Sequence, residues 1–165
     1  MHDPLTGLPN RVLLLDRMTH ALAMSRRTAW PTSLLFLDLD GFTTVDDAYG
    51  HAAGDAVLRQ LAARLVAGLR PGDTAARLGG DEFVVLCENT TAEQAEALAG
   101  RLRAACLVPF DVAGADDVGL GAAVGIGTVD PRQDATDPVA EQLLALADMR
   151  MYEQKRSRTG RPGTG

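Results

Sequence analysis

The chain is poor in aromatic residues, in lysine and in long apolar runs, and each shortage narrows what the protein can be. Only 4% of its 165 residues are aromatic although 46% are hydrophobic, so the core must consist mainly of Leu, Val and Ala. No stretch of about 18 apolar residues occurs and no cationic segment precedes an apolar one, which predicts neither a membrane span nor a signal peptide. The length suits one domain with a single core.

Cysteine and charge restrict the compartment and the partners. Cys87 and Cys106 lack metal-ligand spacing, so we expect two buried thiols in a reducing compartment and hence a cytoplasmic protein. The net charge of −6, without a basic block before the C-terminus, argues against nucleic-acid binding. Lys155 is the one lysine among 16 basic residues. A triphosphate site in so acidic a protein requires divalent cations between the carboxylates and the phosphates.

Hydrophobic periodicity predicts alternating helices and strands. The expected helices cover residues from about 11 to Trp30, about 52–69, about 95–105 and about 140–151. The expected strands cover residues 33–39, 74–78, 82–87 and 118–129, with a tight hairpin between the second and the third. This alternation favours an α/β fold in which helices pack on a mixed sheet. We expect the domain to span residues 1–158, followed by a flexible tail or linker over 159–165, in a module excised from a longer protein.

One acidic motif ends the first expected strand. For Asp38 and Asp40 we expect that they point to opposite faces and that only one of them enters a given site. On its own, such a motif could equally be a strand that ends in a polar turn.

A second acidic motif occupies the tip of the expected hairpin. Gly79-Gly80 permits a sharp turn, and Asp81 and Glu82 follow it directly. An isolated acidic pair at such a tip is often a solvated turn. Together, however, Asp38 and Asp81 could hold two Mg²⁺ ions for an in-line attack on a phosphoryl group. Asp55, at the opening of the next helix, could accept hydrogen bonds from a guanine.

Four motifs, in order along nearly the whole chain, resemble those of the GGDEF family of diguanylate cyclases. They are Asp3-Pro-Leu-Thr-Gly-Leu-Pro-Asn10-Arg11, Asp38-Leu-Asp40-Gly-Phe42, Gly50-His-Ala-Ala-Gly-Asp55 and Gly79-Gly-Asp-Glu-Phe83. The resemblance implies a nucleotidyl-cyclase or palm-like fold, a mixed sheet surrounded by helices, with the last of these motifs on a β-hairpin. It also implies that two GTP molecules are condensed into cyclic di-GMP.

The same resemblance implies roles for individual residues. Asp38, the Leu39 carbonyl and Asp81 would bind two Mg²⁺ or Mn²⁺ ions, and Glu82 would bind metal or assist deprotonation of the attacking hydroxyl. Glu82, Asp81 and Asp38 form the expected catalytic set, and these three with the Leu39 carbonyl form the expected metal ligands.

Substrate binding is expected from a second group of residues. Backbone N–H groups of the turn formed by Gly41, Phe42 and Thr43 would cradle the phosphates. Asp55 would read the guanine, Asp46 would accept from the guanine N2 amino group, and Lys155 would contact the triphosphate. From composition alone, Lys155 could instead be a solvated surface residue.

An inhibitory product site is implied by three further residues. Arg70 and Asp73 form the R-x-x-D motif that precedes Gly79 at the family spacing, and Arg101 matches an additional arginine. Arginine can bind a phosphate bidentately and stack on guanine. The alternative is an arginine at a helix end and an aspartate in a turn.

Two positions depart from the family pattern. Thr43 stands where the family has a lysine, and Asp46 stands where it has an asparagine. An ionised aspartate accepts hydrogen bonds but donates none. Losing one hydrogen bond in a desolvated pocket costs ~1–3 kcal/mol, so GTP binding should be weakened but not abolished. His51 is expected to form structural hydrogen bonds rather than to act as a base.

Two functions therefore remain open. The first is a homodimeric diguanylate cyclase in which each subunit holds one GTP. The second is a catalytically weak or inactive module that binds GTP or cyclic di-GMP and regulates an attached sensory or effector domain; Thr43 and Asp46 support it. Neither function involves nucleic acid or a membrane within this segment.

Overall fold

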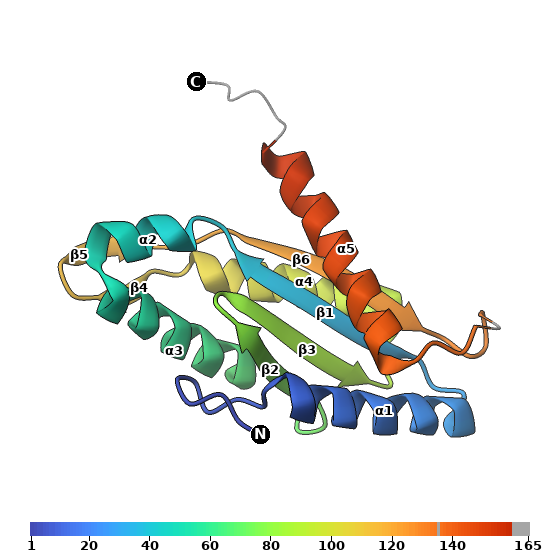
Figure 1. Ribbon diagram of the computed structural model, residues 1–165. Helices are drawn as coiled ribbons and strands as arrows, with labels where there is room; N and C mark the ends of the chain where they lie inside the picture. The colour runs from blue at the N-terminus through green and yellow to red at the C-terminus, as the bar shows by residue number, and fades with distance from the viewer. Residues whose placement is uncertain (135, 160–165) are drawn as a thin grey trace.

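The computed structural model describes residues 1–134 and 136–159 (Figure 1). In that part of the chain the helices are α1 (Arg11–Thr28), α2 (Phe42–Tyr49), α3 (His51–Ala67), α4 (Ala92–Leu107) and α5 (Ala140–Thr159). The strands are β1 (Thr32–Leu39), β2 (Thr74–Gly79), β3 (Glu82–Glu88), β4 (Phe110–Val112), β5 (Ala115–Val118) and β6 (Ala122–Val129). None of the helices in these two ranges combines the length and the apolar character that a bilayer-spanning segment needs.

Four of these strands form the central sheet, in the order β2-β3-β1-β6, and β4 pairs with β5 in a separate hairpin. The α/β class is confirmed, but every neighbouring pair in the sheet is antiparallel, where a mixed sheet was expected. The helical crossovers do join strands of the same direction, β1 to β2 and β3 to β6. In each case a third strand lies between the two, so no parallel neighbours arise.

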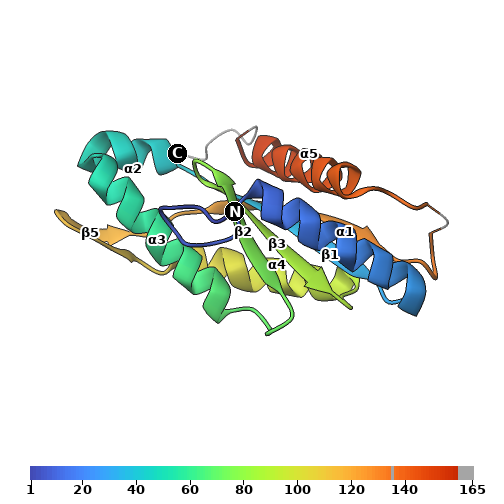
Figure 2. The same cartoon turned by 60° about the horizontal axis from the view of Figure 1, so that its bottom comes forward.

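Helices cover both faces of the sheet (Figures 1 and 2). Helices α1 and α5 lie side by side on one face, and α3 and α4 lie on the other. Helix α2 and the β4–β5 hairpin extend beyond the end of the sheet at which β1 finishes. The loops after β1 and between β2 and β3 therefore meet at one end of the sheet, beside the C-terminal half of α5.

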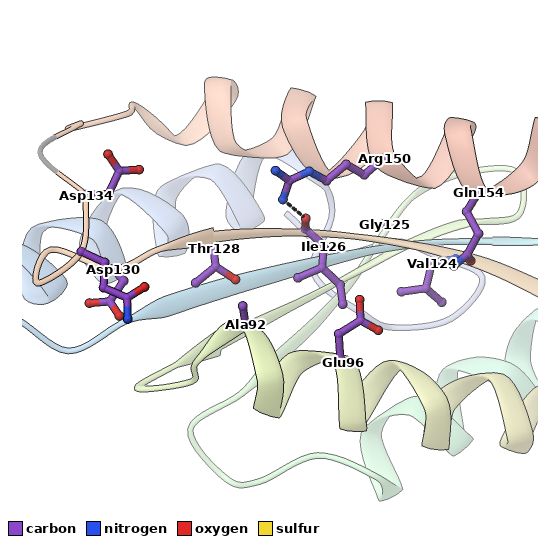
Figure 3. Close-up of a pocket in the computed structure, with 11 residues that line it drawn as sticks. Ala92, Glu96, Val124, Gly125, Ile126, Thr128, Asp130, Asp134, Arg150 and Gln154 are labelled. Atoms are coloured by element: carbon purple, nitrogen blue, oxygen red, sulfur yellow. Dashed lines mark hydrogen bonds between the residues drawn. The ribbon is translucent and has the colours of Figure 1, made fainter.

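Strand β6 is an edge of the sheet, and side chains of α5 cover its open backbone (Figure 3). An edge strand exposes unpaired N–H and C=O groups that need partners. Three residues of α5, spaced four apart, supply them: Arg150 donates to the Ile126 carbonyl (2.7 Å), Gln154 accepts from the Val124 N–H (2.6 Å) and Arg158 donates to the Ala122 carbonyl (2.5 Å). The helix can approach because Gly125 lacks a side chain; a Cβ there would stand 2.1 Å from the Ala147 carbonyl oxygen.

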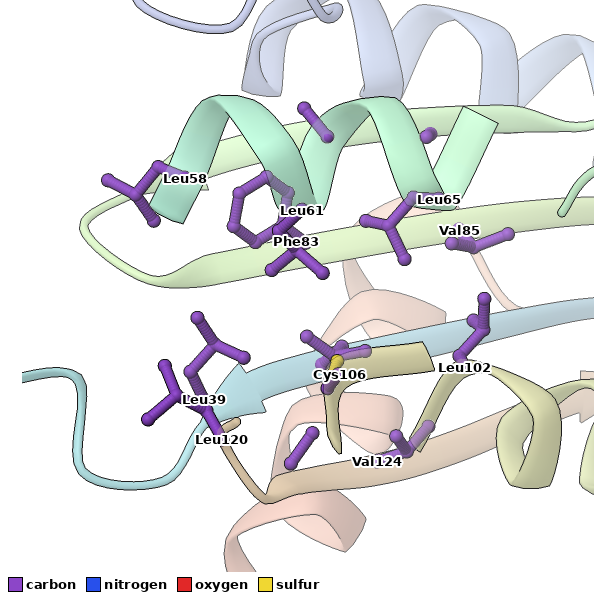
Figure 4. Close-up of a cluster of buried hydrophobic side chains, with 14 of the residues drawn as sticks. Leu39, Leu58, Leu61, Leu65, Phe83, Val85, Leu102, Cys106, Leu120 and Val124 are labelled. Carbon is purple, nitrogen blue, oxygen red and sulfur yellow. The ribbon is translucent and has the colours of Figure 1, made fainter. Parts of the chain in front are cut away.

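The hydrophobic core has two layers, one on each face of the sheet, because strand residues alternate. Odd-numbered residues of β1 and β3 pack against α3 and α4, and even-numbered residues pack against α1 and α5. Figure 4 shows part of the first layer, in which Phe83 and Val85 lie among leucines of α3 and α4. Leu, Val and Ala dominate both layers, as the composition predicted, and Cys87 and Cys106 are buried without a disulfide.

Besides the sheet pairing, the structure differs from the sequence-based expectations in several elements, among them β4, which was not predicted. Helix α2 was not predicted, because its eight residues are fewer than the roughly 11–18 over which a helical period is recognised in a sequence. The expected strand over 118–129 is broken: β5 ends at Val118 and β6 begins at Ala122. Helix α5 continues to Thr159, whereas the expected helix ended at about residue 151. Residues 160–165 of the expected tail lie outside the described residues.

Candidate active site

The two acidic motifs meet where the β2–β3 hairpin turns beside the end of β1. In the antiparallel register Asp38 of β1 lies directly opposite Glu82 of β3, so the two carboxylates share one face of the sheet. Gly79 and Gly80 both have positive φ angles (144° and 49°), which places Asp81 at the tip. The sequence-based expectation that strand end and hairpin tip lie together is confirmed.

Arg77 and Asp3 stabilise the hairpin turn through side-chain contacts. Arg77 donates to the Gly80 carbonyl through Nε (3.0 Å) and Nη2 (2.9 Å), and its Nη1 forms an ion pair with Asp3 at 2.9 Å. Asp3 also accepts hydrogen bonds from the backbone and hydroxyl of Thr6. Asp3 and Thr6, of the motif that opens the sequence, thus stabilise the acidic turn through Arg77. This role was not predicted from the sequence.

Asp38 has an unusual hydrogen-bonding state. Its side chain is 13% exposed, and Oδ2 accepts from the Lys155 ammonium at 2.8 Å. Its other oxygen, Oδ1, is buried and has no hydrogen-bond partner among the described residues. A buried carboxylate oxygen without a partner is costly, and a bound cation would satisfy it. Burial and the nearby Asp38 raise the pKa of Asp81 to about 7, since two carboxylates this close repel each other without a cation.

The carboxylates at this site suit a divalent cation such as Mg²⁺ that also binds to phosphate oxygens of a substrate. Within residues 1–134 and 136–159, no group of three His, Cys, Asp or Glu side chains forms a cage for a metal ion. Mg²⁺ commonly binds to one or two carboxylates and completes its shell with water and substrate phosphates. Asp38 and Asp81 provide such a pair. Burial, followed by the charges of Asp38 and Asp148, raises the pKa of Glu82 above its usual value.

The last helix brings two cations to the end of β1. Lys155 contacts Asp38, and Arg158 forms an ion pair with Asp40 at 2.9 Å while it also donates to Ala122. Asp38 and Asp40 were expected on opposite faces, and this was wrong: residues two apart along a strand lie on the same face, and both carboxylates contact α5. Arg158 was not predicted as a site residue, although its i, i+3 spacing from Lys155 places both cations on one side of a helix.

The residues expected to cradle phosphates begin helix α2 rather than forming a simple turn. Gly41 precedes the helix with a φ of 76°, and Phe42 and Thr43 occupy its first turn. The first N–H groups of a helix have no intrahelical acceptor. The backbone therefore presents N–H groups beside the end of β1, as expected, although the local structure that presents them is different.

Of the two residues expected at the guanine, Asp46 lies in α2 and Asp55 lies in α3. Asp46 contacts His51 at 3.0–3.1 Å, so the expected hydrogen-bonding role of His51 is confirmed. Asp46 also packs on Gly54, where a Cβ would stand 2.6 Å from Oδ1. Asp55 follows in the first turns of α3 and is partly buried. Asp46 therefore forms an acid–imidazole contact with His51 and lies against Gly54, the residue that precedes Asp55.

The three residues of the expected product site line one hollow of about 240 Å³. Asp73, whose side chain is 5% exposed, accepts from the Arg70 backbone N–H at 3.1 Å and faces its guanidinium at 3.4–3.5 Å. Arg70 also donates to Thr90 Oγ1 at 2.6 Å. Cys87 forms part of the wall, and burial, followed by the charge of Asp73, raises the pKa of its thiol to about 12. The structure brings together the three groups that the sequence predicted.

Another hollow, of about 560 Å³, lies over β6 between α4 and α5 (Figure 3). Glu96 of α4 and Arg150 of α5 approach it from opposite sides. None of the residues expected in the active site lines it. It lies along the edge strand, away from the pairing of Asp38 with Glu82.

An acidic hairpin tip beside a strand end, with cations supplied by a neighbouring helix, defines a candidate site for metal-dependent phosphoryl transfer in an α/β domain. The family model described as "Diguanylate cyclase, GGDEF domain" matches residues 1–161, and the chain belongs to this family. Members of the family use divalent metal ions.

Similar proteins agree with this assignment. The chain is 41% identical over 155 residues to MucR of Pseudomonas aeruginosa, named a bifunctional diguanylate cyclase and cyclic di-GMP phosphodiesterase; the match covers 94% of this chain and 22% of MucR. The isolated GGDEF domain of TpbB from the same organism superposes with a TM-score of 0.85 at 37% identity, covering 95% of this chain and 90% of that one. The GGDEF domain of DgcB from Caulobacter crescentus, solved in complex with c-di-GMP, gives a TM-score of 0.84 at 25% identity, covering 95% and 88%.

The chain thus spans about a fifth of the length of MucR.

Proposed function

We propose that this chain is a diguanylate cyclase domain, which condenses two GTP molecules into cyclic di-GMP and releases two pyrophosphates. In each half-reaction the 3′-hydroxyl oxygen of one GTP forms a bond to the α-phosphorus of the other, and the bond to pyrophosphate breaks. Two such bonds close the ring, so two GTP-loaded subunits must face each other in a homodimer. The observation that carries the proposal is the Asp38–Asp81 carboxylate pair, with the unpartnered, buried Oδ1 of Asp38.

The chain's own residues have distinct tasks in this reaction. Asp38, the Leu39 carbonyl and Asp81 would hold two divalent ions, Mg²⁺ or Mn²⁺, which when bound neutralise phosphate charge and polarise the reacting oxygens. Glu82, opposite Asp38, helps to hold them or takes the proton of the attacking hydroxyl.

Substrate recognition falls to the surrounding elements. The N–H groups at Gly41, Phe42 and Thr43 cradle the terminal phosphates, and Lys155 moves from Asp38 to the triphosphate. Asp55 accepts from the N1 and N2 groups of guanine. Asp46 offers a second acceptor there, but it is shared with His51 and cannot donate to guanine N3.

Product binding is assigned to the hollow lined by Arg70, Asp73 and Arg101. Arg101 has no hydrogen bond or ion pair within residues 1–134 and 136–159, so its guanidinium is available to an anion. The c-di-GMP complex of the DgcB domain supports binding of this product by the same fold. Such binding would cross-link subunits, hold their active sites apart and transmit a signal to an attached sensory or effector domain.

The alternative is a module that binds GTP or cyclic di-GMP without turnover. Two observations favour it: Thr43 supplies no cation to the phosphates, and Asp46 is already engaged by His51. Both weaken GTP binding, whereas neither removes a proposed metal ligand. We therefore favour the catalytic diguanylate cyclase over the non-catalytic module.

One experiment separates these functions. The chain, held as a dimer by an N-terminal parallel coiled coil, is incubated with GTP and Mg²⁺, and products are separated by chromatography. A cyclase forms cyclic di-GMP and pyrophosphate, and Asp81→Asn abolishes both products. Asp16→Asn, an exposed acid of α1, is the matched control and should retain activity. If the wild type binds GTP in the presence of Mg²⁺ but forms no product, the non-catalytic module is correct.

A further inference from the structure

The hollow that contains Arg70 and Arg101 is small for a cyclic dinucleotide. Its volume is about 240 Å³, whereas pockets that bury drug-sized ligands measure roughly 300–1,000 Å³. Cyclic di-GMP carries two guanines and two phosphates and is at least that large. The Arg70 hollow, as we name it, can therefore enclose only part of the molecule.

A second hollow, of about 430 Å³, adjoins the first. Arg70 and Gln94 line both, so the two hollows meet at these side chains. We name the second one the Arg132 hollow, after the arginine that lines it from the segment between β6 and α5. Asn89 and Thr91, between β3 and α4, form another part of its wall.

The side chain of Arg132 is held in place but retains donors for a ligand. Its Nε donates to the Ala29 carbonyl at 2.9 Å, and its backbone N–H donates to Asp130 at 3.0 Å. Its two terminal guanidinium nitrogens form no hydrogen bond within residues 1–134 and 136–159. A fixed guanidinium with free donors is suited to bidentate contact with a phosphate.

Gln94 is oriented in a similar way at the junction. Its Oε1 accepts from the Thr91 N–H at 2.9 Å, in a capping box that begins α4. This bond fixes the side-chain amide and leaves its NH₂ group for a ligand. Arg70 also retains a donor for a ligand. Its Nη2 donates to Glu88 and Thr90, whereas its Nη1 makes no hydrogen bond in the described part of the chain.

We propose that the two hollows form one groove and that Arg132 is a second phosphate-binding arginine for cyclic di-GMP. The inference rests on the product binding proposed above. One phosphate binds to Arg70 and Arg101, and the other binds to Arg132. Three arginines and two aspartates, Asp73 and Asp130, line the groove, so its charged side chains sum to +1 and attract a dianion in a protein whose net charge is −6.

The test is a calorimetric titration of cyclic di-GMP into the 165-residue chain and its variants. Arg70→Ala should abolish binding, and Arg132→Ala should weaken it at least tenfold. Because Arg132→Ala also loses the bond to Ala29, Arg132→Gln is measured alongside it: glutamine retains an N–H donor but no charge, and binding should again fall at least tenfold. Arg27→Ala removes an exposed cation of α1 that lines neither hollow, and it should bind as the wild type does.

The outcomes separate this inference from the proposed function. Binding that requires Arg70 but is unchanged in both Arg132 variants overturns the role of Arg132 and leaves the product site intact. An equal loss in Arg27→Ala also overturns it, because the effect would then be one of overall charge. If the wild type does not bind cyclic di-GMP, the product site and the inference both fail.

Discussion

Lys155 of α5 and Asp38 of β1 form an ion pair, with 2.8 Å between Nζ and Oδ2, that joins the last helix to the centre of the candidate site. Burial lowers the pKa of Lys155, but the hydrogen bond and charge of Asp38, with the charges of Asp81 and Asp40, outweigh it and raise the pKa above its usual value. The ammonium therefore occupies one oxygen of a carboxylate that we assign to a metal ion.

This arrangement predicts opposite effects of Lys155→Gln on two ligands. Without nucleotide, Mn²⁺ should bind up to about fivefold more tightly, because partly exposed ion pairs contribute ~0–1 kcal/mol and the metal no longer competes with one. With Mn²⁺ present, GTP should bind more weakly, since a cation facing the triphosphate is lost. Both affinities are measured by calorimetry, with Arg59→Gln on α3 as a control of equal charge change. Changes of the same sign would contradict the exchange of Lys155 between Asp38 and the triphosphate.

A second prediction concerns guanine recognition. Asp46→Asn retains an oxygen that can accept from His51 and adds a donor that guanine N3 can use. The affinity for GTP should rise, by roughly five- to a hundred-fold if one full hydrogen bond of ~1–3 kcal/mol is gained. ATP, which lacks the guanine donor pattern read by Asp55, should bind weakly to both proteins. A GTP affinity that is unchanged or reduced would mean that Asp46 does not lie on the guanine edge.

Some features of this fold and site could be predicted from the sequence, and others could not. Strand order could not be predicted, because the sequence shows that β1 and β2 are separated by helices but not that β3 pairs between them. The acidic residues at the ends of β1 and the hairpin could be placed together, since the motif spacing identifies both loops.

Contacts made across the fold were beyond the sequence pattern. Arg158, Arg77 and Arg132 find partners at Asp40, Asp3 and Ala29, which are distant in the chain. In a chain with 16 basic residues, composition alone does not indicate which of them contacts the site. Helix α2 was missed for a different reason: Phe42, Val45 and Tyr49 do fall on one side of it, but its eight residues are too few to establish a helical period in the sequence.

A third prediction concerns acid stability. Burial raises the pKa of Asp3, but hydrogen bonds from Thr6 and the charge of Arg77 outweigh it, and the net pKa lies below the usual value. A carboxyl group with a lowered folded-state pKa stabilises the fold above its unfolded value of about 4, and this contribution is lost as the pH falls through the folded-state pKa.

Asp3→Asn should therefore lower the free energy of unfolding at pH 7 by about 1.5–3 kcal/mol, the range for hydrogen bonds to a charged group. The difference from wild type should shrink toward pH 3. Urea unfolding at the two pH values measures both quantities. Asp16→Asn, at an exposed position of α1, should show little difference at either pH. A loss for Asp3→Asn that is equal at pH 7 and pH 3 would exclude the charge as its cause.

The last prediction tests the close packing of α5 on the edge strand. A Cβ on Gly125 would stand 2.1 Å from both the Ala147 carbonyl oxygen and the Met151 nitrogen, which are backbone atoms of a helix and cannot rotate away. Gly125→Ala must therefore push α5 off β6 and strain the bonds made by Arg150 and Gln154. Overpacking typically costs ~1–3 kcal/mol, and a backbone clash belongs at the upper end of that range.

The matched control is Gly100→Ala on α4, where a Cβ would meet nothing within 4 Å and the helix should gain ~0.5–1 kcal/mol. Urea midpoints should move in opposite directions for the two variants. Because α5 carries Lys155, Gly125→Ala should also weaken GTP binding, whereas Gly100→Ala should leave it unchanged; a stable Gly125→Ala variant with normal GTP affinity would contradict this account of α5.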